Sequence, residues 1–143
     1  MPTTTTTECE LCRADGGRVL WRDALLRIVA VDAPDYPGFC RVIVNRHAAE
    51  MTDLPVAERD AVMRAVFAVE AALRDAMRPD KINLASLGNM VPHVHWHVIP
   101  RFRDDRHFPA AIWAAAARAG SPSRRCDIDA LAAEIARRLG AQS

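Results

Sequence analysis

The 143-residue sequence contains a single lysine, Lys81, and its 19 basic residues are nearly balanced by 18 acidic ones, giving a net charge of +1. A chain with so little net charge has no electrostatic footprint for nucleic acid or for an acidic membrane surface. We attribute the excess of arginine to genomic composition and not to phosphate recognition. No apolar run approaches the roughly 20 residues that span a bilayer. We therefore expect neither nucleic acid nor a membrane among the partners.

Residues 1–8 also lack the basic start and the apolar run of a signal peptide. The segment is rich in threonine, and we expect it to form a short flexible tail. The chain is 50% hydrophobic and 26% charged, which fits a single domain over residues 9–143 with an ordinary core. Four cysteines without a leader favour a reducing compartment, where they are more often metal ligands or buried thiols than disulfides. We expect a cytoplasmic protein.

Two different hydrophobic periods indicate an α+β fold. Apolar residues at three- and four-residue steps predict one long helix that begins near Pro55 and ends at Arg78, before a proline. A further helix is expected at the C-terminus, over Ile128–Leu139. Short β-branched and apolar runs predict an antiparallel sheet of about five strands. Two of these strands lie within Val19–Val31, and the others cover Phe39–Val44, Lys81–Ala85 and the segment that starts at His93.

Three histidines alternate with apolar residues near the middle of the chain, in the sequence His93-Val94-His95-Trp96-His97-Val98-Ile99. Successive side chains on a β-strand face opposite sides, so the imidazoles share one face and the apolar side chains pack on the core. Three imidazoles within five residues concentrate most of the near-neutral proton and nucleophile chemistry of the chain in one place.

Three interpretations of this cluster are open from the residues alone. Neighbouring histidines on one strand face lie about 6.6 Å apart and can share a metal ion, whereas the outer two lie about 13 Å apart and cannot easily do so. One imidazole can instead act as a nucleophile while its neighbours handle protons. A histidine-rich strand without function is disfavoured, because burial of three imidazoles requires partners for every ring nitrogen.

The segment 93–99 resembles the signature of the histidine-triad (HIT) family. The resemblance extends from Cys9 to Trp113. The sequence over this range is similar to bacterial HIT proteins often labelled diadenosine tetraphosphate hydrolases. It implies a HIT-like fold. It also implies a nucleotide hydrolase or nucleotidyl transferase that cleaves at the α-phosphate of adenosine or other purine nucleotide conjugates. Diadenosine polyphosphates, nucleoside phosphoramidates and aminoacyl adenylates all present that phosphate.

The resemblance also assigns roles to individual residues. His95 is the nucleophile, which forms a nucleotidyl-histidine intermediate, and His97 contacts the same phosphate. A phosphate-binding turn precedes the triad, with donors around Gly88, Asn89 and Val91. By the same resemblance Asp32 accepts hydrogen bonds from the ribose hydroxyls, and Asn83 lies near the ribose or phosphate. From the residues alone, Asp32 is equally well a turn cap and Asn83 a residue that bonds only backbone.

Cys9 and Cys12 form a CxxC knuckle, which by itself is compatible with a redox pair or a metal site. The resemblance implies a structural zinc held by Cys9, Cys12, His47 and His93, a closed set of two thiolates and two imidazoles. The alternative is an unmetallated knuckle in which His93 bonds to backbone. We expect no organic cofactor. Cys40 and Cys126 are interpreted as ordinary buried or surface thiols.

Two other functions are kept open beside the enzyme: a nucleotide-binding regulatory protein with little turnover, and a catalytic metalloprotein that uses His93 and His95 as ligands. The resemblance further implies a homodimer that takes a small nucleotide as substrate. After the triad, Arg101 and Arg103 are candidates to contact a distal phosphate, but we expect them to lie in a solvated loop, as we do His107. Trp113 is expected either to pack at the nucleotide site of a dimer partner or to be buried in its own core.

Overall fold

The computed structural model describes residues 8–120 and 123–140, so the tail predicted over 1–8 lies almost entirely outside the described residues. Secondary structure alternates in an order typical of an α+β chain. The elements are α1 (Glu10–Arg13), β1 (Arg18–Arg22), β2 (Leu26–Ala30), β3 (Cys40–Val44), the 3₁₀ turn η1 (Met51–Asp53), α2 (Val56–Met77), β4 (Lys81–Ala85), β5 (His95–Arg101) and α3 (Ile128–Leu139).

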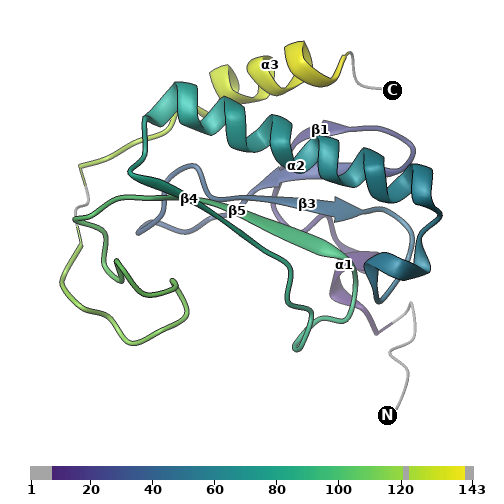
Figure 1. Cartoon of the computed structure of the whole chain (residues 1–143), viewed down its shortest axis with the longest axis horizontal. Coiled ribbons are helices and arrows are strands. Elements are labelled where there is room, and N and C mark those ends of the chain that lie inside the picture. The colour runs from purple at the N-terminus through teal and green to yellow at the C-terminus, as the bar shows by residue number, and fades with distance from the viewer. Residues whose placement is uncertain (1–7, 121–122, 141–143) are drawn as a thin grey trace.

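The five strands form one sheet in the order β1-β2-β3-β5-β4, and every neighbouring pair is antiparallel. Figure 1 shows α2 and α3 on one side of this sheet, whereas α1 and the long loop after β5 lie on the other. The predicted α+β fold with five strands, one long helix and a C-terminal helix is confirmed. The molecule therefore has two unlike faces: one covered by helices and one flanked by a helical turn and a loop.

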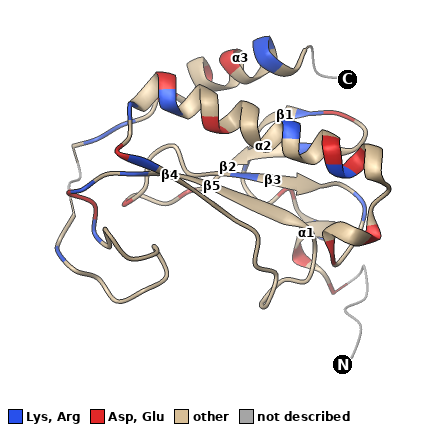
Figure 2. Ribbon diagram, viewed as in Figure 1, with Lys and Arg blue, Asp and Glu red and all other residues tan. Residues whose placement is uncertain are grey.

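The long helix follows its apolar period closely. Its buried positions recur at three- and four-residue steps: Val62, Ala65, Val66, Val69, Ala72 and Leu73. The helix ends where Arg78 adopts the left-handed conformation (φ 49°) ahead of Pro79. Figure 2 shows acidic and basic segments interleaved along α2 and α3. Among the described residues no helix is both long and apolar enough to cross a membrane.

The histidine strand begins two residues later than the sequence predicts. β5 starts at His95. The residue before it, Val94, forms its backbone hydrogen bonds outside the regular pairing of the strands, because its amide donates to the carbonyl oxygen of Ala48 and its carbonyl oxygen accepts from the amide of Val44. The alternation of faces nevertheless persists. Val94, Trp96 and Val98 belong to the core beneath α2, while the three histidines are buried on the opposite face.

The single turn α1 is absent from the prediction, because four residues are too few to show a helical period. It places Leu11 against Val29 and Ile43 on the same face of the sheet as the histidines. The end of α1 is held by the buried Arg27, whose guanidinium donates to the carbonyl oxygens of Leu11 and Ala14. The N-terminal segment that carries the CxxC knuckle is thereby held against the sheet.

Candidate active site and metal centre

His95 is oriented by the chain immediately before it. Its Nδ1 lies 2.6 Å from the backbone carbonyl oxygen of His93. A carbonyl oxygen only accepts, so Nδ1 carries the proton and donates, which leaves Nε2 with a free lone pair. The side chain is 8% exposed. The hydrogen bond selects the tautomer of the imidazole in which Nε2 is the nucleophilic nitrogen.

His97 lies beside His95, with ring centroids 5.0 Å apart. Phe39 and Trp113 also contact its ring, at centroid distances of 5.7 and 5.0 Å. Burial, reinforced by His95 and Arg41, lowers the pKa of His97 to about 4. The imidazole is therefore neutral near pH 7. Its buried Nδ1 has no hydrogen-bond partner within the described part of the chain.

The turn between β4 and β5 is attached to the start of the histidine strand. The Ser86 hydroxyl donates to the carbonyl oxygen of His95, at 2.9 Å. Gly88 has a φ of +85°, a conformation that favours glycine. The amides of Gly88, Asn89 and Met90 have no hydrogen-bond partner among the described residues, and Val91 packs against the apolar cluster beneath α1. The turn thus offers unpaired backbone donors of the kind that bind phosphate.

The two predicted ribose contacts have different surroundings. Asp32 follows β2, is exposed, and has no partner in the described ranges. It lines a cleft of about 630 Å³ whose wall includes Cys126 and Ile128 but none of the three histidines. Its loop is anchored where the Val31 amide donates to the Phe39 carbonyl, beside His97. Asn83 lies in the middle of β4, and its side-chain oxygen accepts from Arg101 at 2.7 Å. Asp32 is free to bind a ligand, whereas the Asn83 oxygen is already engaged.

The four predicted metal ligands come together. The ligand atoms of Cys9, Cys12, His47 and His93 all lie within 4.8 Å of one another. The Sγ of Cys9 is 3.3 Å from the Nδ1 of His93, and that of Cys12 is 3.4 Å from the Nδ1 of His47. Tetrahedral zinc with ordinary bond lengths separates a thiolate sulfur from an imidazole nitrogen by about 3.5 Å. The donor set and its spacing fit a closed zinc site.

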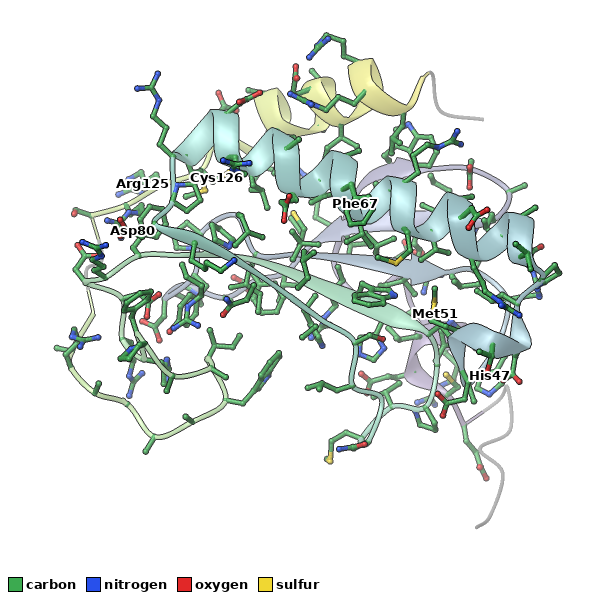
Figure 3. The ribbon with its side chains drawn as sticks, in the orientation of Figure 1. His47, Met51, Phe67, Asp80, Arg125 and Cys126 are labelled. Atoms are coloured by element: carbon green, nitrogen blue, oxygen red, sulfur yellow. The ribbon has the colours of Figure 1, made fainter. Side chains whose placement is uncertain are left out.

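His93 is prepared for this role by a backbone contact. Its Nε2 donates to the Val44 carbonyl oxygen at 2.6 Å, so Nδ1 is the unprotonated nitrogen facing the thiols. Figure 3 shows His47 beside η1, at the end of the sheet where the N-terminal segment lies. His95 is not part of the cluster. The candidate metal site and the candidate nucleophile are therefore separate, and they share only the short segment from His93 to His95.

The expectation that Arg101 is solvated is wrong. Its side chain is 1% exposed and forms two hydrogen bonds to the Asp105 carboxylate, at 2.8 and 3.1 Å. Burial alone raises the pKa of Asp105, but Arg101 and three backbone amides outweigh it and hold that pKa well below its ordinary value. His107 is also not free, since its Nδ1 hydrogen-bonds to the Tyr36 hydroxyl. The sequence shows that charged residues follow the strand, but it does not show that Arg101 and Asp105 pair with each other and become buried.

This buried ion pair shapes the loop that carries Trp113. The Asp105 carboxylate accepts from the amides of His107 and Phe108, and the Arg101 guanidinium donates to the carbonyl of Ala110. The loop returns to the histidine face, where Trp113 lies against His97 while remaining 52% exposed. Trp113 is therefore not buried in the core of its own chain. Instead it partly covers its own triad.

The site combines an imidazole oriented by a backbone carbonyl, a neighbouring imidazole with a lowered pKa and a turn with unpaired backbone amides. The family model described as "HIT domain" matches residues 15–104. The chain belongs to the HIT family. It is also 27% identical over 112 residues to AP-4-A phosphorylase from Mycobacterium tuberculosis. That match covers 74% of this chain and 57% of the relative, so the chain spans little more than half the length of the curated relatives it matches.

Solved structures share the fold. A histidine triad protein from Bradyrhizobium japonicum superposes with a TM-score of 0.70 at 23% identity, covering 87% of this chain and 92% of that one. A Zn-bound histidine triad family protein from Mycobacterium smegmatis gives a TM-score of 0.61 at 18% identity, covering 94% and 95%. The five-stranded sheet and its helices are thus the architecture of HIT proteins.

Proposed function

We propose that this protein is a nucleotide hydrolase or nucleotidyl transferase that acts at the α-phosphate of a purine nucleotide conjugate through a nucleotidyl-histidine. The observation that carries the proposal is the hydrogen bond from His95 Nδ1 to the His93 carbonyl. It orients a nearly buried imidazole so that Nε2 is the nitrogen left for attack. Membership in the HIT family and the similarity to an AP-4-A phosphorylase support a nucleotide substrate.

The reaction requires two displacements at phosphorus. His95 Nε2 attacks the α-phosphorus, forms an N–P bond and expels the leaving group, which takes up a proton. An acceptor then attacks the same phosphorus and breaks the N–P bond, returning Nε2 to its free state. Water as the acceptor gives a nucleoside monophosphate. Inorganic phosphate as the acceptor gives a nucleoside diphosphate, the outcome suggested by the name of the phosphorylase relative.

The surrounding residues supply donors for the charge that gathers on the α-phosphate. The free amides at Gly88 and Asn89 and the ring of His97 would bind its oxygens. The unpartnered Asp32 carboxylate would accept hydrogen bonds from the ribose hydroxyls, with Asn83 and Val91 at the edges of the site. Trp113 would limit access of water to the phosphate while the leaving group is bound.

The Cys9, Cys12, His47 and His93 cluster would hold a structural zinc ion. Such an ion supplies no catalytic chemistry, because four protein ligands leave no open coordination position. Its contribution is to clamp the N-terminal turn and the segment before β5 together, which fixes the carbonyl that orients His95. The homodimer and the cytoplasmic location implied by the resemblance stay predictions; light scattering on the purified protein would test the first.

The deciding experiment is rapid-quench mass spectrometry of the intact protein at neutral or basic pH, because the phosphorus–nitrogen bond is acid-labile. Wild type and His95→Asn are compared with an adenosine phosphoramidate and with diadenosine tetraphosphate. We expect a transient nucleotidyl adduct in the wild type alone. His107→Asn serves as the matched control, since that histidine lies outside the triad. Repeating the reaction with added inorganic phosphate distinguishes hydrolysis from phosphorolysis by the product formed.

The chief alternative is a nucleotide-binding regulatory protein with little turnover. It would bind nucleoside monophosphates equally well before and after the His95→Asn substitution, and would give neither adduct nor product with either substrate. Unchanged turnover in the His95→Asn protein would contradict the mechanism itself. A catalytic metalloprotein is disfavoured by the separation of His95 from the metal cluster, and loss of zinc on replacement of His95 would revive it.

A further inference from the structure

Three arginines extend from the sheet on the face that carries the histidines. Arg41 on β3 is directly opposite His97, Arg27 on β2 pairs with the residue opposite His95, and Arg101 lies four residues beyond His97 on β5. Two of the three are fully engaged by their own chain. Arg27 donates to three backbone carbonyls and to the Asn45 side chain, and Arg101 is held by Asp105 and its neighbours.

Arg41 is different from the other two. Its single hydrogen bond joins Nη1 to the Gly16 carbonyl oxygen at 3.4 Å, close to the limit for a hydrogen bond. Its Nε is buried without a partner, and no carboxylate forms an ion pair with it in the described ranges. The Phe39 ring lies 5.9 Å from the guanidinium carbon. A guanidinium has five N–H donors and no acceptor, so most of the donors of Arg41 are available to a ligand.

The position of this guanidinium follows from its contacts. From β3 the side chain extends away from β5 and reaches Gly16, which comes just before β1. The next residue, Gly17, lies against the backbone of Ala30 at the end of β2. Asp32 follows two residues later. The guanidinium therefore lies on the Asp32 side of the triad, not on the side where β5 borders β4.

A nucleotide with its α-phosphate at His95 and its ribose at Asp32 must cross β3. That strand lies between β5 and β2, and two strand spacings amount to about 10 Å. The sugar and base then lie above the Val29–Arg41 pair, with the leaving group on the other side of His95. Arg41 is thus placed under the nucleoside and away from the phosphates that leave.

We infer that Arg41 is a specificity-determining residue that binds the nucleobase through its acceptor edge and favours guanine or hypoxanthine over adenine. This inference rests on the proposed function. Guanine presents two acceptors side by side, N7 and O6, which match the fork of a guanidinium. Adenine presents an amino donor in place of O6, and two donors cannot bond to each other. The purine in the substrate is then a 6-oxopurine, in place of the adenine that the resemblance implies.

The test is calorimetric titration of wild type, Arg41→Leu and Arg41→Gln with GMP, IMP and AMP. Arg64→Leu is the matched control, because Arg64 is exposed on α2 on the opposite face of the sheet. We expect wild type and control to bind GMP and IMP about tenfold more tightly than AMP, the discrimination of one bidentate contact. Both Arg41 variants should bind all three nucleotides with affinities that differ by less than twofold.

The outcomes separate this inference from the function on which it rests. Equal affinity of the wild type for GMP and AMP would overturn the role of Arg41 and leave the nucleotide site intact. A loss of the same factor for GMP and AMP in Arg41→Leu would place Arg41 on the phosphate and overturn it as well. If the wild type binds none of the three nucleotides, the proposed function fails and this inference fails with it. Zinc content and circular dichroism would confirm that each variant is folded.

Discussion

Trp113 lies edge-on to His97 with ring centroids 5.0 Å apart, although the two residues are separated by fifteen others along the chain. The contact covers one side of the triad while Trp113 itself remains half exposed. Because burial is the largest cause of the low pKa of His97, the indole helps to keep that imidazole neutral. A residue of the loop after β5 thereby contributes to the electrostatics of the site.

Replacement of Trp113 by alanine should raise the pKa of His97 from about 4 towards the ordinary histidine value near 6.5. The physical reason is renewed access of water to the ring. The measurement is an NMR titration of the His97 Cε1 proton in both proteins, with Trp113→Phe as the control that keeps an aromatic cover. An unchanged titration midpoint in the alanine variant would show that Trp113 does not shield His97.

The Asp105→Asn substitution should destabilise the protein by about 3–5 kcal/mol, because it leaves the buried Arg101 guanidinium without its counter-charge. Denaturant unfolding provides the measurement. The adjacent Asp104 is a matched control: its carboxylate is more than half exposed and pairs with a partly exposed Arg124, so Asp104→Asn should cost less than about 1 kcal/mol. Equal losses in the two variants would mean that burial of the Arg101–Asp105 pair contributes nothing.

Cys12→Ser should reduce bound zinc from about one ion per chain to nearly none, since a serine hydroxyl is a poor ligand for this ion. Elemental analysis after gel filtration measures the content. Cys126→Ser controls for loss of a thiol elsewhere, and His95→Asn should keep its zinc because His95 lies outside the cluster. Retention of zinc by Cys12→Ser would contradict the assigned ligand set.

The low pKa of His97 also predicts how stability depends on pH. The folded protein binds this proton less tightly than the unfolded chain, whose histidines have a pKa near 6.5. The contribution is complete above about pH 6.5 and is lost as the pH falls through about 4. The wild type should therefore lose stability below pH 6.5 more steeply than His97→Gln, by at most about 1.4 kcal/mol per pH unit. Parallel curves for the two proteins would refute the shift.

Patterns of neighbouring residues predicted those helices and strands that depend on interactions between residues close together in the sequence. The bounds of β4 and α3 agree with the prediction to the residue, and those of α2 to within one, because strand and helix periods are visible in the sequence itself. The predicted start of β5 at His93 is wrong, because the observed start depends on hydrogen bonds between Val94 and residues nearly fifty positions earlier in the chain. The single turn α1 was missed because four residues show no period.

The candidate site divides in the same way. The sequence by itself determined that the three triad imidazoles share one face of their segment and that the thiols of Cys9 and Cys12 are spaced as metal ligands. Alternation and CxxC spacing are properties of residues that are close together in the chain. Only the tertiary structure decided that Arg101 is buried, that Trp113 lies against His97 and that Arg41 keeps an unpaired donor on the face of the sheet that carries the histidines. These facts depend on which strands pair, in what register, and on where a loop returns, and all three are set by contacts between distant residues.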